Sequence, residues 1–330
     1  MKHLFVINPH SFKATNNMVQ VLTEIESCFS REHDDEYNIH ISRYSRDAIA
    51  VVHRYISACH KDETVRIYAI GGDGILFECL NGMIGFSNAE LTGVPYGNAN
   101  DFARMFGESE EVITRFKNIR ELSKAPAHPI DIIDCGTNHA LLEINIGLIG
   151  QTIIHANTLF PRLPAKWLRK NIGFAYTLSG IRAVANHELM KQYYNIAIDG
   201  YDISGNYSNI HVANTAVNGG SLIPSPYAIP DDGILNVVLA STTDSFKALR
   251  SIKNYTKGLF EKYNFYTHKT FKTMEISSDK ILHVEMDGEG FFAKELKINI
   301  IPGGVKIFAP EGLDCVDYSY KAYKPKIKNK

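Results

Sequence analysis

The sequence is poor in several features that would assign it to a class of protein at once. Its 330 residues include one tryptophan and five cysteines, and its formal net charge is only −1. A chain with so balanced a charge has no overall attraction to nucleic acid or to an anionic membrane, so any membrane contact must come from a local patch. The cysteines form neither a Cys-x-x-Cys pair nor a zinc-finger pattern, which favours reduced cysteines in a cytoplasmic protein.

Long apolar runs are also missing. No stretch approaches the roughly 18 apolar residues that a membrane-spanning helix needs. Residues 1–9 predict a first strand rather than a signal peptide, because their apolar run is short and no small-residue cleavage site follows it. With 45% apolar residues, the chain is long enough to form two packed domains.

The hydrophobic pattern changes about one third of the way along the chain. Residues 4–106 alternate short β-rich runs with segments of helical spacing, which predicts a parallel sheet covered by helices. From about residue 130 most segments alternate like strands between glycine-rich turns, which favours an antiparallel β-sandwich. Two helical stretches, 166–185 and 245–258, interrupt these strands.

The predicted fold class is therefore α/β plus β. We expect a Rossmann-like α/β domain that binds a nucleotide over residues 1–128 and an antiparallel β-sandwich domain over residues 129–310. The break at Ala125-Pro126-Ala127-His128-Pro129 sets the boundary. Residues 311–330 form a tail that could pack back on the first domain.

The strongest local signal is a glycine-rich loop between a strand and a helix. Gly71, Gly72 and Gly74 surround Asp73, and glycines let a backbone turn sharply and approach a ligand. Their amides, with the N-terminus of the following helix, can cradle phosphate oxygens. Asp73 would repel phosphate unless a cation or a hydroxyl lay between them, so it suggests Mg²⁺ or proton handling. The alternative is a plain tight turn with a helix cap.

Three further segments carry groups suited to the same chemistry. Residues 8–11 (Asn-Pro-His-Ser) end the first predicted strand, and residues 95–104, with Asn98 and Asp101, follow another. Loops at the carboxyl ends of neighbouring parallel strands meet at one crevice, although each segment could also be an ordinary turn or helix cap. Residues 287–289 (Asp-Gly-Glu) place two carboxylates around a glycine. One of them could accept the proton of an attacking hydroxyl, and a plain hairpin turn is the alternative.

Together these segments resemble the diacylglycerol kinase catalytic-domain family. The family signatures N-P-x-S-G, G-G-D-G-T-x-x-E-V-x-N-G, P-x-G-T-x-N-D-F-A-R and D-G-E are similar, in this order, to residues 8–12, 71–82, 95–104 and 287–289. Weaker matches lie between them, among them Ile130-Asp131, Asn145, Gly219-Gly220 and Asp232-Gly233. Three positions depart from these signatures: Phe12 replaces a glycine, Ile75 replaces a threonine, and Asn98 replaces the threonine of P-x-G-T-x-N-D-F-A-R.

The resemblance implies a kinase that uses ATP and Mg²⁺ to phosphorylate a lipid hydroxyl, with diacylglycerol converted to phosphatidic acid as the first choice. Carried over position by position, Asp287 matches the general base, with Glu289 beside it and Asp73 as the second candidate. The residues expected to hold the nucleotide are Asn8, Ser11, Gly71, Gly72, Asp73, Gly74, Glu78, Gly97, Asn98 and Asp101.

The resemblance also implies two sites for Mg²⁺. Asp73, Asp101 and Asp131 match an acidic network that positions the catalytic ion. Asp232, with the carbonyls of Ile229 and Ile234, matches a structural Mg²⁺ site.

The expected partner is a lipid presented at a membrane surface. This implies a cytoplasmic protein with peripheral membrane contact and no nucleic-acid partner, and it leaves a homodimer open. Leu159–Phe174 mixes aromatic and basic residues and is the candidate contact surface, an ordinary core helix being the alternative. Two rival functions are a kinase for a soluble substrate, similar to NAD kinase, and a lipid- or nucleotide-binding protein weakened in catalysis by Phe12 and Ile75.

Overall fold

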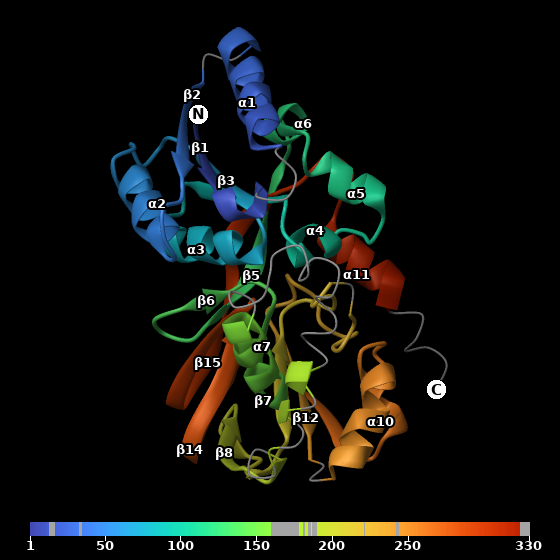
Figure 1. Ribbon diagram of the computed structural model, residues 1–330. Helices are drawn as coiled ribbons and strands as arrows, with labels where there is room; N and C mark the ends of the chain where they lie inside the picture. Colours follow the sequence, from blue (N-terminus) through green and yellow to red (C-terminus); the bar gives the residue numbers. More distant parts are fainter. Residues whose placement is uncertain are drawn as a thin grey trace.

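The computed structural model describes residues 1–12, 17–32, 35–159, 178–180, 182–183, 186, 190–220, 222–241 and 244–323. They form two lobes stacked along the long axis of the molecule (Figure 1). The predicted helix over 166–185 and the candidate membrane surface over Leu159–Phe174 therefore lie almost wholly outside the described residues.

The upper lobe is a parallel sheet covered by helices. Its strands are β1 (Lys2–Ile7), β2 (Glu36–Ile41), β3 (Val65–Gly71) and β4 (Ala89–Pro95), which pair in the order β2-β1-β3-β4. The helical elements are η1 (Pro9–Phe12), α1 (Met18–Glu32), α2 (Asp47–Ser57), α3 (Asp73–Met83), α4 (Asp101–Arg104), α5 (Glu110–Arg115) and α6 (Ile119–Ser123). Helices on both faces explain why β3 is buried along its whole length and reads as a continuous apolar run.

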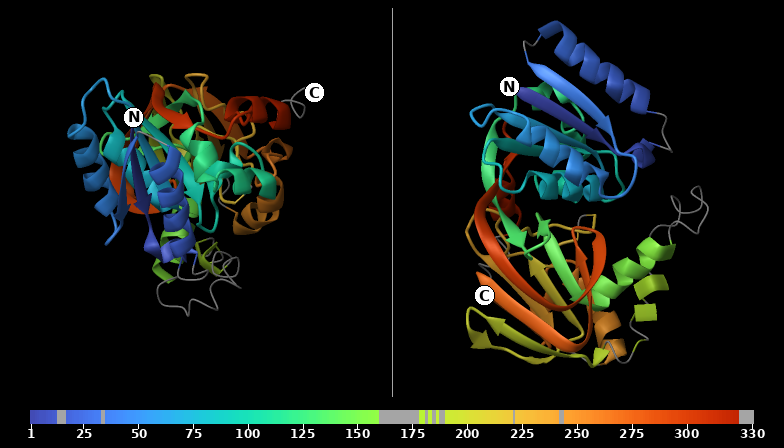
Figure 2. Two further views of the ribbon diagram at one scale, coloured as in Figure 1. Left: turned by 90° about the horizontal axis from the view of Figure 1, so that it is seen from above. Right: turned by 90° about the vertical axis from the view of Figure 1, so that its left-hand side faces the viewer.

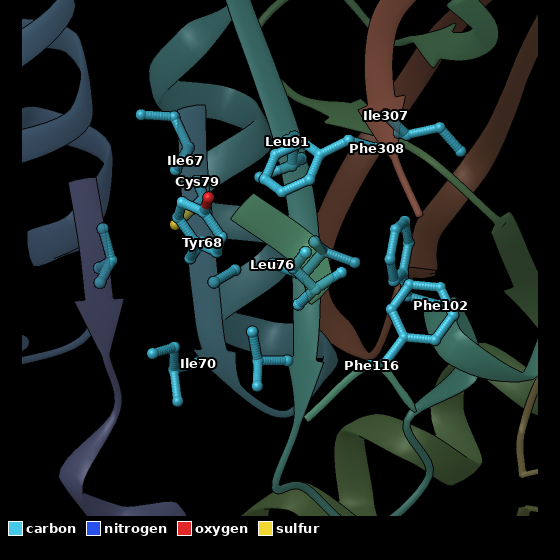
Figure 3. Packing of buried hydrophobic residues seen from close by; sticks show 14 of the residues in the cluster. Ile67, Tyr68, Ile70, Leu76, Cys79, Leu91, Phe102, Phe116, Ile307 and Phe308 are labelled. Carbon is cyan, nitrogen blue, oxygen red and sulfur yellow. The ribbon is translucent and has the colours of Figure 1, made fainter. Parts of the chain in front are cut away.

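The core of the upper lobe is dense in aromatic side chains. The ring of Tyr68 on β3 stacks on Phe5 of β1 at a centroid distance of 4.2 Å and meets Phe308 edge-on at 5.0 Å. Figure 3 shows Tyr68 and Phe308 with the neighbouring Phe102 and Phe116. Phe308 lies 240 residues from Tyr68 in the chain, so the end of the sequence closes the core of the first domain.

The lower lobe is built mainly from antiparallel strands. These are β5 (Ala127–Asp134), β6 (His139–Ala140), β7 (Glu143–Gly147), β8 (Tyr193–Ile198), β9 (Tyr201–Asp202), β10 (Gly205–Asn206), β11 (Asn209–Ala213), β12 (Leu235–Ala240), β13 (Tyr266–Phe271), β14 (Thr273–Met286) and β15 (Glu289–Phe308). The helical elements of this lobe are α7 (Leu148–Leu159), α10 (Ser245–Tyr255) and η3 (Phe260–Lys262), whereas the last helix, α11 (Cys315–Tyr323), packs through Cys315 into the core of the upper lobe. A second apolar core lies inside this lobe. The predicted fold class, an α/β domain followed by an antiparallel β domain, is confirmed.

Two strands carry the chain between the lobes. The long β15 pairs with β14 over 289–299, with β5 over 299–308, and with β4 of the upper sheet at Lys306 and Ile307. One hydrogen-bonded path therefore runs from β13 to β2 through both lobes. The predicted short strands over 296–300 and 305–308 are parts of this one strand.

Helix α7 was not predicted from the sequence. It begins Leu-Ile-Gly-Gln-Thr-Ile-Ile, which is rich in β-branched residues and has no clear polar face. The lack of a polar face fits its position, because the helix packs on β14 and β15. None of the described helices combines the length and the apolar character that crossing a bilayer requires.

Candidate active site

Three loops meet where β1, β3 and β4 end. The Asn8 amide donates to the carbonyl of Ile70 at 2.9 Å, and the Tyr96 amide donates to the carbonyl of Gly71 at 2.7 Å. A Cβ placed on Gly71 would come within 3.1 Å of the Ser11 hydroxyl oxygen. The loops that the sequence assigned to one crevice are therefore in direct contact.

The glycines of two loops touch through their backbones. A Cβ placed on Gly97 would lie 2.3 Å from the Cα of Gly72, far below an ordinary contact. The side chain of Asn100 holds the Gly97 loop in place. Its Oδ1 accepts from the Gly97 amide at 2.8 Å, and its Nδ2 donates to the Gly97 carbonyl at 3.0 Å. Only glycine at position 97 allows this approach.

Replacing Gly97 by alanine is therefore expected to push the two loops apart. We expect a loss of roughly 1–3 kcal/mol in the free energy of unfolding, as for other overpacked sites. Thermal unfolding measures this loss. The matched control is Gly205→Ala, whose Cβ meets neighbours at an ordinary 3.5 Å. Equal behaviour of the two variants would contradict the importance of the close approach.

Asp73 lies in the glycine loop, and its carboxylate caps helix α4, which follows a different loop. Its Oδ2 accepts from the Asn100 amide at 3.0 Å, and its Oδ1 accepts from the Asp101 amide at 2.9 Å. These amides belong to the start of α4, whose own residue at the cap position, Asn100, has a left-handed φ of 54° and no side-chain cap bond. Asp73 thereby locks the two loops together. Burial raises its pKa above the ordinary value.

Asp101 joins the upper lobe to the lower one. Its side chain is only 7% exposed, and its Oδ1 accepts from the amide of Gly220 at 2.6 Å. Burial, and then the charge of Asp73, raises the pKa of Asp101 to about 7. The Gly219-Gly220 turn comes from the segment between β11 and β12, so the second domain supplies the amide that holds this carboxylate.

Asp287 occupies the tight turn between β14 and β15. It has a left-handed φ of 46°. Its carboxylate accepts three amides, from Leu141 at 2.6 Å, Leu142 at 3.0 Å and Glu143 at 2.9 Å. Burial raises the pKa of Asp287 to about 6 against the effect of these amides, and the charge of Asp73 adds to the rise. The carboxylates of the two lobes therefore act on one another across the junction.

Glu289 reaches from the same turn to the glycine loop. Its Oε1 lies 3.0 Å from the point where a Cβ on Gly74 would stand. The pKa of Glu289 is raised by partial burial and by the carboxylate of Glu78, and the Arg46 cation opposes the rise. Sequence reasoning missed Arg46, which has a left-handed φ of 67°. Its only sequence signal was its place beside the predicted start of a helix.

Glu78, predicted to help bind the nucleotide, has a structural use in this arrangement. Its Oε1 accepts from the Arg46 amide at 2.8 Å, and its Oε2 accepts from the Ala48 amide at 3.0 Å. Both oxygens are thus engaged with the start of α2. Glu78 holds Arg46 beside the site, and its role toward a nucleotide stays a prediction.

Next to Asp287 lies a buried polar network, of which the sequence singled out only Asn145. Glu285, Asn145 and His211 stand abreast on β14, β7 and β11. Asn145 donates its Nδ2 to Glu285 at 2.7 Å, and its Oδ1 lies 2.9 Å from His211 Nδ1. Glu143 is within 3.3 Å of the same His211 nitrogen and accepts from the side chain of Asn218. Burial raises the pKa of Glu285 to about 7 and lowers that of His211 to about 3.

Asp131 contacts different turns from those that hold Asp73 and Asp101. It is 2% exposed, and its oxygens accept from the amides of Gly233 at 2.7 Å and Gly303 at 2.8 Å. Asp131 therefore secures two turns of the lower lobe, and its predicted place in a Mg²⁺ network stays a prediction.

The proposed structural Mg²⁺ site lies next to Asp131. Asp232 uses its Oδ1 to accept from the Ile234 amide at 3.0 Å. Its pKa is raised by burial and by the charges of Asp131 and Asp231. The set Asp232, Ile229 and Ile234 likewise stays a prediction.

Two of the three departures from the family signatures point inward. Phe12 is 4% exposed and packs its ring against Tyr96 at a centroid distance of 4.7 Å, and Ile75 is 3% exposed in the upper core. Asn98, by contrast, is exposed. Phe12 and Ile75 therefore fill the core behind the loops.

Comparison with known proteins identifies the class. Residues 2–135 match the diacylglycerol kinase catalytic domain, and residues 163–309 match the YegS C-terminal NAD kinase beta sandwich-like domain. The two matched regions follow one another along the chain, so the chain resembles a diacylglycerol kinase catalytic domain joined to a YegS-type C-terminal domain. The prediction of a kinase-family resemblance is confirmed.

Individual relatives extend over nearly the whole chain. A protein of Shewanella frigidimarina named "Probable lipid kinase YegS-like" is 24% identical over 291 residues, which are 87% of this chain and 88% of that protein. A protein of the same name from Pseudomonas fluorescens is 25% identical over 304 residues, 92% and 94% of the two chains. The crystal structure of a diacylglycerol kinase from Bacillus anthracis strain Sterne superposes with a TM-score of 0.67 at 20% identity, covering 95% of this chain and 98% of that one, and supports the fold.

Proposed function

We propose that this protein is a lipid kinase that transfers the γ-phosphate of ATP to a lipid hydroxyl, with diacylglycerol as the acceptor. One observation carries the proposal. The glycine loop at the start of α3 faces the turn that holds Asp287 and Glu289, and Glu289 reaches to within 3.0 Å of the Cβ position of Gly74. The glycine loop and a buried carboxylate thus stand on opposite sides of one domain junction.

The residues fit a magnesium ion that arrives with the nucleotide. Among the described residues no group of three or more His, Cys, Asp or Glu is placed to hold a metal by itself. Mg²⁺ at kinase sites is usually bound through one or two carboxylates together with substrate phosphates, and Asp73 and Asp101 are the carboxylates beside the loop. When bound, the ion would neutralise charge on the transferred phosphate.

The protein groups divide the remaining work. The amides at the start of α3, with the glycine loop, would bind phosphate oxygens at the positive end of the helix. Asp287 would orient the lipid hydroxyl and take its proton, because a base with a pKa of about 6 is ionised at neutral pH and still basic enough to act. The three amides on its carboxylate fix its direction.

A transfer assay tests this function. The full chain is incubated with Mg²⁺ and γ-labelled ATP, and with diacylglycerol, sphingosine or ceramide in mixed micelles, or with NAD in solution. We expect label in lipid, with diacylglycerol the best acceptor. NAD is included because the C-terminal domain model is described as similar to the NAD kinase β-sandwich. Label in NAD and in no lipid would overturn the proposal.

A further inference from the structure

Helix α10 carries an apolar row on its outer face. Phe246, Leu249 and Ile252 follow one another at intervals of three residues and are 71%, 45% and 42% exposed. The opposite face is buried through Ala248, Ser251 and Tyr255. A surface helix normally turns its apolar residues toward the core, whereas these three each leave a large part of the side chain in contact with solvent.

Positive charge borders the apolar row. Lys247, Arg250, Lys253 and Lys257 are exposed along the same helix and its end, and the one acidic residue of 244–257 is Asp244. Asp244 is the N-cap and accepts from the Phe246 amide at 2.9 Å and the Lys247 amide at 3.2 Å. An apolar strip edged by cations complements an anionic bilayer, which offers both an apolar interior and negative headgroups.

The buried face of α10 lies near the polar network of the candidate active site. Tyr255 belongs to a small buried cluster, with Val238 and Phe260, against which Ile149 of α7 packs. The ring of Tyr255 lies 6.3 Å, centroid to centroid, from that of His211 in the polar network next to Asp287. Figure 1 shows α10 at the end of the lower lobe, away from the α/β domain, and Figure 2 (right) shows α7 and α10 on the same side of that lobe. A surface that held α10 would therefore lie against the lobe that presents Asp287.

We propose that α10 is the element that docks this protein on an anionic lipid bilayer. Phe246, Leu249 and Ile252 enter the headgroup boundary, and the neighbouring lysine and arginine side chains contact lipid phosphates. That the bilayer delivers the substrate rests on the lipid kinase function proposed above, whereas the docking itself does not. This assigns membrane contact to α10, in addition to or in place of the segment 159–174 expected from the sequence.

Sedimentation with vesicles tests the docking directly. The full chain is mixed with vesicles of phosphatidylglycerol and phosphatidylcholine, or of phosphatidylcholine alone. We expect binding to the anionic vesicles, and a loss of about tenfold or more in the triple variant Phe246→Ser, Leu249→Ser, Ile252→Ser. The matched control is Tyr201→Ser, Ile281→Ser, Phe292→Ser, which removes three side chains that are 78%, 53% and 60% exposed elsewhere on the lobe. Thermal unfolding of both variants confirms that they are folded.

A second variant tests the charges. Lys247→Gln, Arg250→Gln, Lys253→Gln should remove the preference for anionic vesicles and its dependence on salt. Unchanged vesicle binding by the folded α10 variants, or an equal loss in the control variant, overturns the proposal. A wild-type dimer in solution that the serine variant converts to a monomer, without vesicle binding by either, would assign the row to a second copy of the chain and also overturn it.

Turnover separates this proposal from the function. Dioctanoylglycerol below its solubility limit serves as an acceptor that needs no bilayer. Vesicle binding that depends on α10 without any lipid phosphorylation would leave the docking standing and the kinase function refuted. Equal phosphorylation of vesicle lipid by the wild type and the serine variant would refute the docking and leave the kinase function standing.

Discussion

Replacing Asp287 by alanine is expected to lower kcat for lipid phosphorylation by about 10²–10⁴-fold, the usual contribution of a general base. Asp287 is the buried carboxylate of the lower lobe whose pKa is also raised by the charge of Asp73 in the glycine loop. Removing Asp287 leaves the lipid hydroxyl without a base to take its proton and leaves the glycine loop unchanged. Labelled-phosphate transfer measures the rate, and calorimetric titration should show Mg·ATP affinity close to that of the wild type.

The structural role of Asp287 must be separated from its chemical one. Its carboxylate accepts three backbone amides, so the variant will also lose stability. The pH dependence distinguishes the two roles. Wild-type activity should fall as the pH drops through about 6, because the carboxylate becomes protonated; the alanine variant should lose this limb. A folded variant with near wild-type turnover would remove Asp287 from the role of base.

Replacing Asp101 by asparagine is expected to have opposite effects on activity and on stability. Activity should be largely lost, because a carboxylate beside the phosphate loop disappears. Stability of the metal-free protein should rise, because the carboxylate is 7% exposed and stands near Asp73, while asparagine still offers an oxygen to the Gly220 amide. Residues selected for function commonly cost stability in this way.

The sign of the stability change depends on pH. The pKa of Asp101 is raised from 3.8 to about 7 in the folded protein, so folding disfavours its ionised form. This cost is absent below the unfolded pKa and complete above about pH 7. In the presence of a chelator at pH 7.5 the variant should therefore melt about 2–4 °C higher than the wild type, and the difference should vanish near pH 4.

The control for Asp101 is a carboxylate at the surface. Asp62→Asn, whose side chain is 92% exposed, should change neither melting temperature nor turnover. An Asp101→Asn variant that melts lower than the wild type and keeps full activity would show that Asp101 serves the structure alone.

The sequence predicted the parts of the site that depend on local order. Gly71 to Gly74 and Gly97 to Asp101 follow buried strands, and the carboxyl ends of neighbouring parallel strands meet, so their convergence could be foreseen. The bond between Asp73 and the start of α4 could not, because it needs the relative height of two loops 28 residues apart. The lower lobe was harder still. Glu285, Asn145 and His211 stand side by side only through strand register between distant segments, and a single sequence does not reveal that register.

Some carboxylates at motif positions also have structural contacts. Glu78 and Asp131 fall on family signature positions, yet each gives both carboxylate oxygens to backbone amides. A carboxylate that secures a turn and one that handles a ligand look the same in a sequence, since both are acids beside a glycine. Asp287 also gives both oxygens to backbone amides, so turnover and its pH dependence are needed to separate the two uses.

A double-mutant cycle in turnover tests most directly whether the two lobes form one site. Labelled-phosphate transfer to diacylglycerol is measured for the wild type, Asp101→Asn, Asp287→Ala and the double variant. If both carboxylates serve one reaction, the losses in turnover should be strongly non-additive. The double variant should then be about as active as the less active of the two single variants. Losses that multiply independently, or a single variant with full activity, would contradict a shared site between the glycine loop and the Asp287 turn.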